Sequence, residues 1–160
     1  MPHESPRRCL RLALTPMRVR AVEGMRPPTA ADEHRRASLM YHAYFGTIDY
    51  EGEEETQALG EVRSTFSGKY GAFMWSASRV IEREGMLISA ALLTRWQDRP
   101  FVAFSITRPE FQRQGFARAC LMSAVNQLIV DGEHELRLAA TLANVAAMGL
   151  YQSLGFRVQQ

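Results

Sequence analysis

A junction between a predicted strand and a predicted helix, residues 109–117, carries the residues best suited to chemistry. Gln112, Gly115 and Ala117 follow the spacing Q-x-x-G-x-A directly before an apolar helical pattern. The first amides of a helix lack intrahelical acceptors and the helix dipole is positive there, so this junction can bind a phosphate or pyrophosphate. Gly115 has no Cβ to keep the anion away, and Arg113 can add a direct charge. The alternative is an ordinary glycine-containing helix start, since this spacing recurs by chance in about one chain in ten of this size.

Hydrophobic periodicity predicts the elements that position this junction. Segment 101–107 is nearly all apolar, as expected of a strand in the middle of a sheet, and the apolar residues of 115–130 share one helical face. Turns at Glu84-Gly85 and Gln97-Asp98 join three consecutive strands. The predicted order is a strand over 17–25, helices over 29–46 and 55–68, strands over 77–83, 86–96 and 101–107, a helix over 115–130, a strand over 135–140, a helix over 144–155 and a short strand from 156.

This order of elements predicts one mixed α/β domain, and the length of 160 residues fits a single domain. Residues 1–16 are polar, bounded by prolines and without a sustained period. We therefore expect them to form an N-terminal extension that is disordered or adds an edge strand. Residues 17–160 are predicted to form the domain itself.

Composition argues against several classes of protein. The formal net charge of +2 is too small to indicate a nucleic-acid surface, and no window approaches the roughly 18 consecutive apolar residues of a membrane span. Cys9 and Cys120 lack a Cys-x-x-Cys context and the four histidines are scattered, so neither a metal site nor a disulfide framework is expected. We also expect no secretory signal, and the protein is predicted to be cytoplasmic.

Together with a second motif, the junction resembles the GNAT superfamily of N-acetyltransferases. The segments ITRPEFQRQGFARACL and ATLANVAAMGLYQSLGF contain the phosphate-binding turn, then Asn144 and a helix end of the form Y-x-x-L-G-F that begins at Tyr151. The match runs from about Phe101 to Phe156. It implies a mostly antiparallel central sheet, splayed between its fourth and fifth strands (101–107 and 135–140), with helices on both faces and a C-terminal strand that is short or missing.

The resemblance also implies acetyl-CoA as co-substrate, without a metal. Backbone amides of the turn would bind the CoA pyrophosphate: Gln112, Arg113, Gln114, Gly115, Phe116 and Ala117. The end of the preceding strand would pair with the pantetheine arm as if with another strand, through Ser105, Ile106 and Thr107. Asn144 would meet the pantetheine or the acceptor side, and it also suits a helix N-cap.

Tyr151 is the catalytic residue that the resemblance implies. Acyl transfer to an amine expels the CoA thiolate, and a neutral phenol with a pKa near 10 can donate to a sulfur whose thiol has a pKa near 8.5. Direct attack by the amine needs no covalent enzyme intermediate. A main-chain amide near Ile106 or Thr107 would polarise the thioester. The alternative for Tyr151 is packing beside Ala147 and Leu154.

The substrate side departs from the family's pattern. The family often places a carboxylate on the splayed strand, where this chain has only Ser105 and Thr107. The base is therefore a water or a carboxylate of segment 46–55, with Asp49 and Glu51 as candidates that would suit a cationic amine. We expect an N-acetyltransferase acting on a small-molecule or peptide amine. The alternative is a non-catalytic acyl-CoA-binding regulatory domain of the same fold.

The C-terminal end departs as well, because residues 157–160 are too few for the usual closing strand. Three arrangements remain open at this edge of the sheet. Residues 10–20 could occupy it, a partner subunit could do so, or the edge could stay open. An unpaired edge invites pairing with a second copy, so a homodimer is one expectation.

Overall fold

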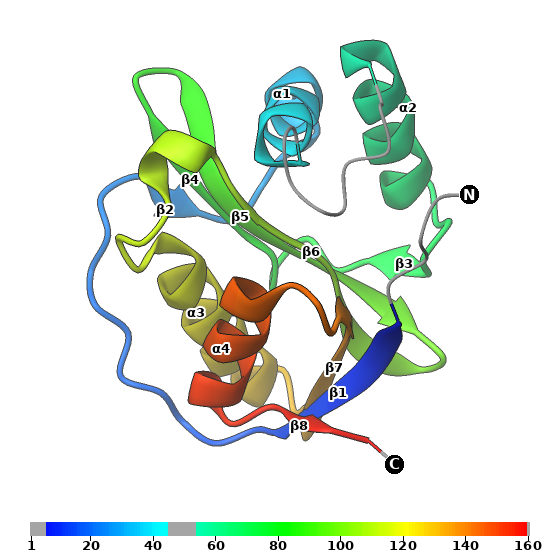
Figure 1. Cartoon of the computed structure of the whole chain (residues 1–160), viewed down its shortest axis with the longest axis vertical. Coiled ribbons are helices and arrows are strands. Elements are labelled where there is room, and N and C mark those ends of the chain that lie inside the picture. The colour runs from blue at the N-terminus through cyan, green and yellow to red at the C-terminus, as the bar shows by residue number, and fades with distance from the viewer. Residues whose placement is uncertain (1–5, 45–53, 160) are drawn as a thin grey trace.

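A central sheet with a pair of helices on each face forms the protein (Figure 1). The computed structural model describes residues 6–44 and 54–159. Its helices are α1 (Glu33–Tyr44), α2 (Glu55–Phe66), α3 (Phe116–Val130) and α4 (Val145–Leu154), with short 3₁₀ turns at Ala30–Asp32 and Pro109–Phe111. Its strands are β1 (Arg7–Ala13), β2 (Met25–Arg26), β3 (Ala72–Phe73), β4 (Arg79–Arg83), β5 (Met86–Trp96), β6 (Arg99–Thr107), β7 (Glu135–Thr141) and β8 (Arg157–Val158).

The strands lie in the order β2-β4-β5-β6-β7-β1-β8, with β3 also paired to β5. Every pairing is antiparallel except that of β6 with β7. Helices α1 and α2 lie on one face of the sheet, and α3 and α4 lie on the other (Figure 1). The expected mixed, mostly antiparallel sheet with helices on both faces is confirmed.

Local turn chemistry is confirmed at both predicted hairpins. Glu84 and Gly85 have φ of 52° and 76°, and Gln97 and Asp98 have φ of 51° and 63°. Two successive residues at positive φ are typical of the turns whose twist matches that of the flanking strands. These turns set the register of β4, β5 and β6.

The splay between β6 and β7 is also confirmed. These strands pair only at Phe101 with Arg137 and at Val102 with Leu138. Directly beyond, β6 carries a bulge, because Leu93 pairs with Val102 whereas Leu92 pairs with Phe104, which leaves Ala103 as the extra residue. A bulge bends its strand and increases its twist, so Ala103 marks the point where β6 leaves β7.

The bulge also changes the face of the sheet on which the even-numbered side chains of β6 lie. Val102 packs in the cluster on the α3 and α4 face, whereas Phe104 and Ile106 pack in the cluster beneath α1 and α2. Fully buried leucines such as Leu121 and Leu92 anchor the two clusters. Each buried leucine contributes about 2 kcal/mol from its removal from water.

The strand expected over 17–25 is wrong. Only Met25 and Arg26 pair with β4, and residues 14–24 run as an irregular segment, here called the strap, along α3 (Figure 1). The strap is held by side chains instead of a ladder: Met17 N donates to Asn126 Oδ1 at 2.8 Å, and Asn126 Nδ2 donates to Met17 O at 2.8 Å. Of its apolar residues, Leu14, Met17 and Val22 pack against the core cluster on the α3 and α4 face, whereas Ala21 is exposed.

The N-terminal strand occupies the edge that the sequence left open. β1 lies between β7 and β8, pairing with β7 along its whole length and with β8 at Leu10 and Arg11. Leu10 and Leu12 are buried against the α3 and α4 face. Of the three arrangements, the structure therefore has the chain's own N-terminal segment at this edge, over residues 7–13 instead of 10–20. The C-terminal strand β8 is short, as expected.

Candidate active site

Two left-handed residues shape the loop that leads into α3. Arg113 has φ of 63° and Gly115 has φ of 80°, and residues 112–115 are all exposed. A left-handed arginine costs about 1 kcal/mol relative to the right-handed conformation, so the loop holds a strained shape. Strain of this kind is concentrated at ligand-binding sites.

The start of α3 leaves its amides unpaired. Within the described residues, the N–H groups from Arg113 to Arg118 donate to no protein acceptor, and the first helical bond runs from Ala119 N to Gly115 O at 3.0 Å. The N-cap Gly115 has no side chain to satisfy them. These unpaired donors coincide with the positive end of a helix of 15 residues, which favours an anion. The predicted residues 112–117 thus meet in one turn.

Two arginines from other parts of the chain flank this loop. Arg20 of the strap donates to Gln114 O at 2.6 Å, and its guanidinium carbon lies 5.4 Å from the ring centre of Phe116. Arg83, at the end of β4, lies 5.0 Å from the same ring. A hollow of about 280 Å³ lies between them, lined also by Ala21, Val22, Glu23 and Gln114.

Strand β6 directs alternate backbone groups toward the side that β7 has left. Arg108 N donates to Ile88 O at 2.9 Å, so residues 108 and 88 are a hydrogen-bonded pair. Since such pairs alternate along an antiparallel ladder, the N–H and C=O groups of Ser105 and Thr107 point away from β5. Gln112 Nε2 donates to Thr107 O at 3.3 Å, which agrees with this direction. The backbone groups of Ile106 face β5, and its side chain is buried.

A buried hydroxyl supports the end of β6. Ser89 Oγ on β5 lies 2.8 Å from Thr107 Oγ1 and is itself fully buried. Cys120 of α3 interacts with Ser89. Burial raises the pKa of the Cys120 thiol to about 12. A thiol with that pKa stays protonated at neutral pH and is a poor nucleophile. Cys120 therefore has a packing role.

Asn144 and Tyr151 are both positioned by α4. Asn144 caps this helix as expected, since its Oδ1 accepts from Ala147 N at 3.2 Å and its own N–H donates to Thr141 O at the end of β7. The Tyr151 side chain is buried in the core, edge-on to Phe156 with ring centres 5.9 Å apart. Ala147 and Leu154, which the alternative named as packing neighbours, lie against the same core cluster, and Phe156 contacts the ring.

The sequence profile described as the Acetyltransferase (GNAT) family matches residues 33–156. This span contains the α3 loop, the splay between β6 and β7, and α4. The chain belongs to the GNAT acetyltransferase family.

The chain is similar to named N-acetyltransferases. It is 33% identical over 99 residues to the ribosomal protein bS18-alanine N-acetyltransferase of Escherichia coli strain K12, an alignment that covers 53% of this chain and 66% of that protein. The alignment thus spans just under two thirds of the relative's length.

Solved structures show the same fold. The ribosomal-protein-S18-alanine N-acetyltransferase from Escherichia coli superposes with a TM-score of 0.65 at 20% identity, covering 85% of this chain and 78% of that one. The PaiA N-acetyltransferase from Thermoplasma acidophilum, solved in complex with coenzyme A, superposes with a TM-score of 0.65 at 16% identity, covering 89% and 92%.

In this GNAT chain the two predicted substrate-side carboxylates, Asp49 and Glu51, lie outside the described residues. Of the acidic residues that follow them, Glu54 and Glu55 begin α2, where Glu54 and Gln57 form a capping box. Within residues 6–44 and 54–159, no group of three or more His, Cys, Asp or Glu residues is placed to hold a metal ion. No helix of that part is long and apolar enough to cross a membrane.

Sequence reasoning missed Arg83 at this site, together with Arg20, Ser89 and Ala103. Arg20 belongs to the segment that was expected to be a strand, so nothing linked it to a loop more than ninety residues away. Ser89 reads as one polar residue in an apolar strand, and its contact with Thr107 follows from the strand register. The bulge at Ala103 has no local signature beyond its small side chain.

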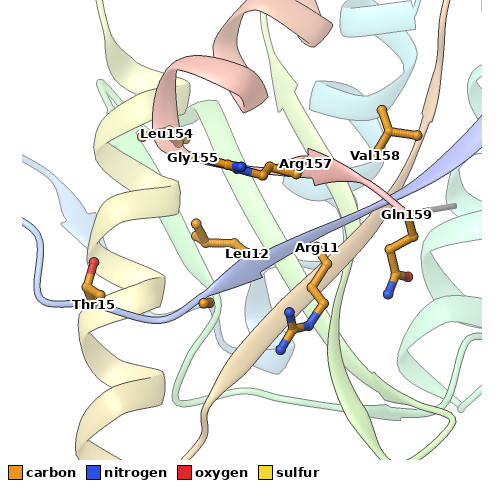
Figure 2. A pocket seen from close by; sticks show the side chains of 9 residues that line it. Arg11, Leu12, Thr15, Leu154, Gly155, Arg157, Val158 and Gln159 are labelled. Carbon is orange, nitrogen blue, oxygen red and sulfur yellow. The ribbon is translucent and has the colours of Figure 1, made fainter.

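A larger hollow of about 530 Å³ lies away from this site, between β1, β8 and the end of α4 (Figure 2). Leu12, Thr15, Leu154 and Arg157 are among its lining residues. This hollow lies beyond the pair of Arg11 with Arg157, where β1 continues without β8 beside it. Its lining includes none of the described residues that the sequence assigned to the cofactor. The larger of these two hollows therefore does not coincide with the candidate active site.

Proposed function

We propose that this chain is an acetyl-CoA-dependent N-acetyltransferase in which a primary amine attacks the thioester directly. Membership of the GNAT family supports the reaction class, and the amide turn and splayed strands support the cofactor. The acceptor is an amine of a small molecule or a peptide. The protein is proposed to act in the cytoplasm.

The unpaired amides from Arg113 to Arg118 are the observation that carries the proposal. They offer a row of N–H donors to the CoA diphosphate, and Arg113 adds charge beside them. The same turn lies directly after the end of β6, whose Ser105 and Thr107 groups point into the splay. A diphosphate bound at the turn would extend its pantetheine arm along these groups as an added strand.

The acetyl group would then lie near Thr107. The backbone N–H of Thr107 points toward the splay and is suited to polarise the thioester carbonyl. The backbone N–H of Ile106 faces β5 instead. The expectation of an amide near Ile106 or Thr107 thus narrows to Thr107. Ser89 holds the Thr107 side chain and steadies this end of the strand.

Tyr151 is the proposed proton donor. The amine nitrogen forms a bond to the acetyl carbon, the carbon–sulfur bond breaks, and the phenol hydrogen passes to the CoA sulfur. The amine loses its own proton to a water or to a carboxylate of the 46–55 segment, and the tyrosinate regains a proton from solvent. Asn144 would orient the cofactor from the start of the same helix while it caps that helix.

A non-catalytic acyl-CoA-binding domain is the second candidate. It is favoured by the absence of any carboxylate on β6, where only Ser105 and Thr107 are polar beyond the splay. Such a domain would bind the cofactor at the same turn without turning it over. Homodimerisation is a proposal for either function, and it would have to use a surface other than the edge of β7, which β1 occupies.

Calorimetry with acetyl-CoA and a thiol-release assay separate these functions. Binding with turnover of at least one amine supports the transferase, and the panel should include a peptide that begins with alanine, because the relative is named for that acceptor. Binding without turnover of any amine supports the second candidate. No binding at tens of micromolar acetyl-CoA contradicts both.

A further inference from the structure

We propose that Arg20 is a positioning residue for the CoA diphosphate, acting from the strap on the peptide bond between Gln114 and Gly115. The inference rests on the proposed cofactor site at this loop. It assigns a role in cofactor binding to a segment that lies outside the residues matched by the family profile, 33–156.

The geometry of one peptide unit carries the argument. Arg20 Nη2 donates to Gln114 O at 2.6 Å, a short distance for a charged donor. All the described peptide bonds are trans, so the Gly115 N–H points opposite to the Gln114 carbonyl. With the carbonyl held toward Arg20, that N–H is turned away from the strap and is left unpaired by the protein.

This orientation needs an external restraint because the peptide unit ends on a permissive glycine, in a loop that also holds a strained residue. Gly115 is a glycine at φ of 80°, and Arg113 stands in the left-handed region one residue before Gln114. A peptide unit that ends on a glycine rotates easily unless one of its groups is bonded. Within the described residues, Gln114 O accepts no backbone hydrogen bond, so the arginine is its protein partner.

The strap presents Arg20 at a defined place. Its earlier part is fixed to α3 by the paired hydrogen bonds between Met17 and Asn126, and its Leu14 N donates to His134 O at 2.9 Å. The Arg20 guanidinium rests on the buried ring of Phe116, the first residue of α3. These contacts limit the side chain before any ligand arrives, which lowers the entropy cost of binding.

The charges around the loop favour the same ligand. Arg20, Arg83 and Arg113 are the cations here, and Glu23 is the acidic residue that lines the hollow beside them. Gly115 lies directly beside this arginine, since a Cβ built on it would be in ordinary contact with Arg20 Nη2 at 3.5 Å. The surroundings therefore suit a dianionic diphosphate held against the loop.

The test compares Arg20→Ala with Arg18→Ala, a matched control that removes an exposed arginine of the same strap. Calorimetry with CoA should show an affinity loss of about 10- to 100-fold for Arg20→Ala, as for a lost hydrogen bond from a charged donor, and less than twofold for Arg18→Ala. Equal affinities for wild type and Arg20→Ala overturn the inference. A wild-type protein that fails to bind CoA contradicts the proposed function instead.

Two further readouts separate positioning from simple attraction. The ratio of the CoA affinities of wild type and Arg20→Ala should change by less than about twofold between 50 and 500 mM salt, because salt does not screen the orientation of a peptide bond. A ratio that falls to one at high salt would mean that Arg20 acts only as a screened charge and would overturn the inference. Turnover of S-acetylpantetheine, which has no diphosphate, should be equal in the two proteins. If Arg20→Ala lowered the turnover of S-acetylpantetheine as much as it lowers the affinity for CoA, the substitution would have damaged the whole site, and the assignment would be overturned.

Discussion

Two helix starts in this GNAT chain are built in opposite ways. Helix α4 begins at Asn144, whose side chain accepts from Ala147 N, so its first turn is closed by the protein itself. Helix α3 begins at Gly115, which has no capping side chain, and its first amides have no protein acceptor within the described residues. A cap contributes about 1 kcal/mol, so the chain forgoes that stability at α3.

Other helix starts in the described chain resemble α4. Thr29 and Asp32 form a capping box at the turn before α1, and Glu54 with Gln57 forms one at α2. The open start is thus the exception, and it coincides with the strained loop and with the arginines that flank it. The contrast supports the proposed cofactor site, because the start of α3 is where capping is withheld, whereas the capped helix α4 carries Tyr151 in the core.

The largest effect should come from filling the open start. Gly115→Glu places a negative side chain at φ of 80° beside Arg20, at the open start of α3, and should weaken CoA binding by more than a hundredfold in calorimetry. Gly68→Glu is the matched control, since Gly68 also has positive φ but open space around it and lies after α2. An affinity loss of similar size in both variants would mean that strain, and not the anion site, explains the result.

The second largest effect should come from removing the hydroxyl group of Tyr151, which lies on the capped helix α4. Tyr151→Phe keeps the ring that packs on Phe156 and removes only the hydroxyl, so turnover should fall about a hundredfold while the Kd for CoA stays within twofold. Steady-state assays across pH and calorimetry check the two parts. Unaltered turnover at every pH would show that the tyrosine serves packing alone.

A smaller effect concerns acid stability at the capped turn before α1. Hydrogen bonds from Arg26 lower the pKa of the buried Asp32 from 3.8 to about 2. Because the folded-state pKa lies below the unfolded one, this stabilisation is complete above about pH 4 and disappears as the pH falls toward 2. Unfolding free energies should lose about 2 kcal/mol over that window from this group. Asp32→Asn should lack that part of the pH dependence; an unchanged dependence would contradict the assignment.

The smallest expected effect is the loss of the α4 cap itself. Asn144→Ala should reduce the free energy of unfolding by about 1 kcal/mol and Tm by about 3 °C. Asn144→Asp retains an acceptor for Ala147 N and should restore most of the stability. A thermal melt of both variants checks this, and equal losses in the two would show that the cap is not the reason.

Much of the architecture followed from local patterns. The hairpin turns at residues 84–85 and 97–98, the apolar strand ending at Thr107 and the cap at Asn144 all depend on neighbours in sequence, and the structure confirms them. The turn at 112–117 was visible for the same reason, because an uncapped helix start after a strand is a local feature. The roles of its individual residues, and of Tyr151, stay predictions.

The sequence by itself determined the helices, the hairpins and the loop before α3, since these depend on hydrogen bonds and sterics within a few residues. Only the tertiary structure decided where the N-terminal segment goes, because Leu10 and Leu12 become buried by pairing with β7, a strand more than a hundred residues away. That choice carries the strap across α3 and brings Arg20 to Gln114. Pairings between distant segments are selected by the apolar surface they bury together, and no single segment contains that information.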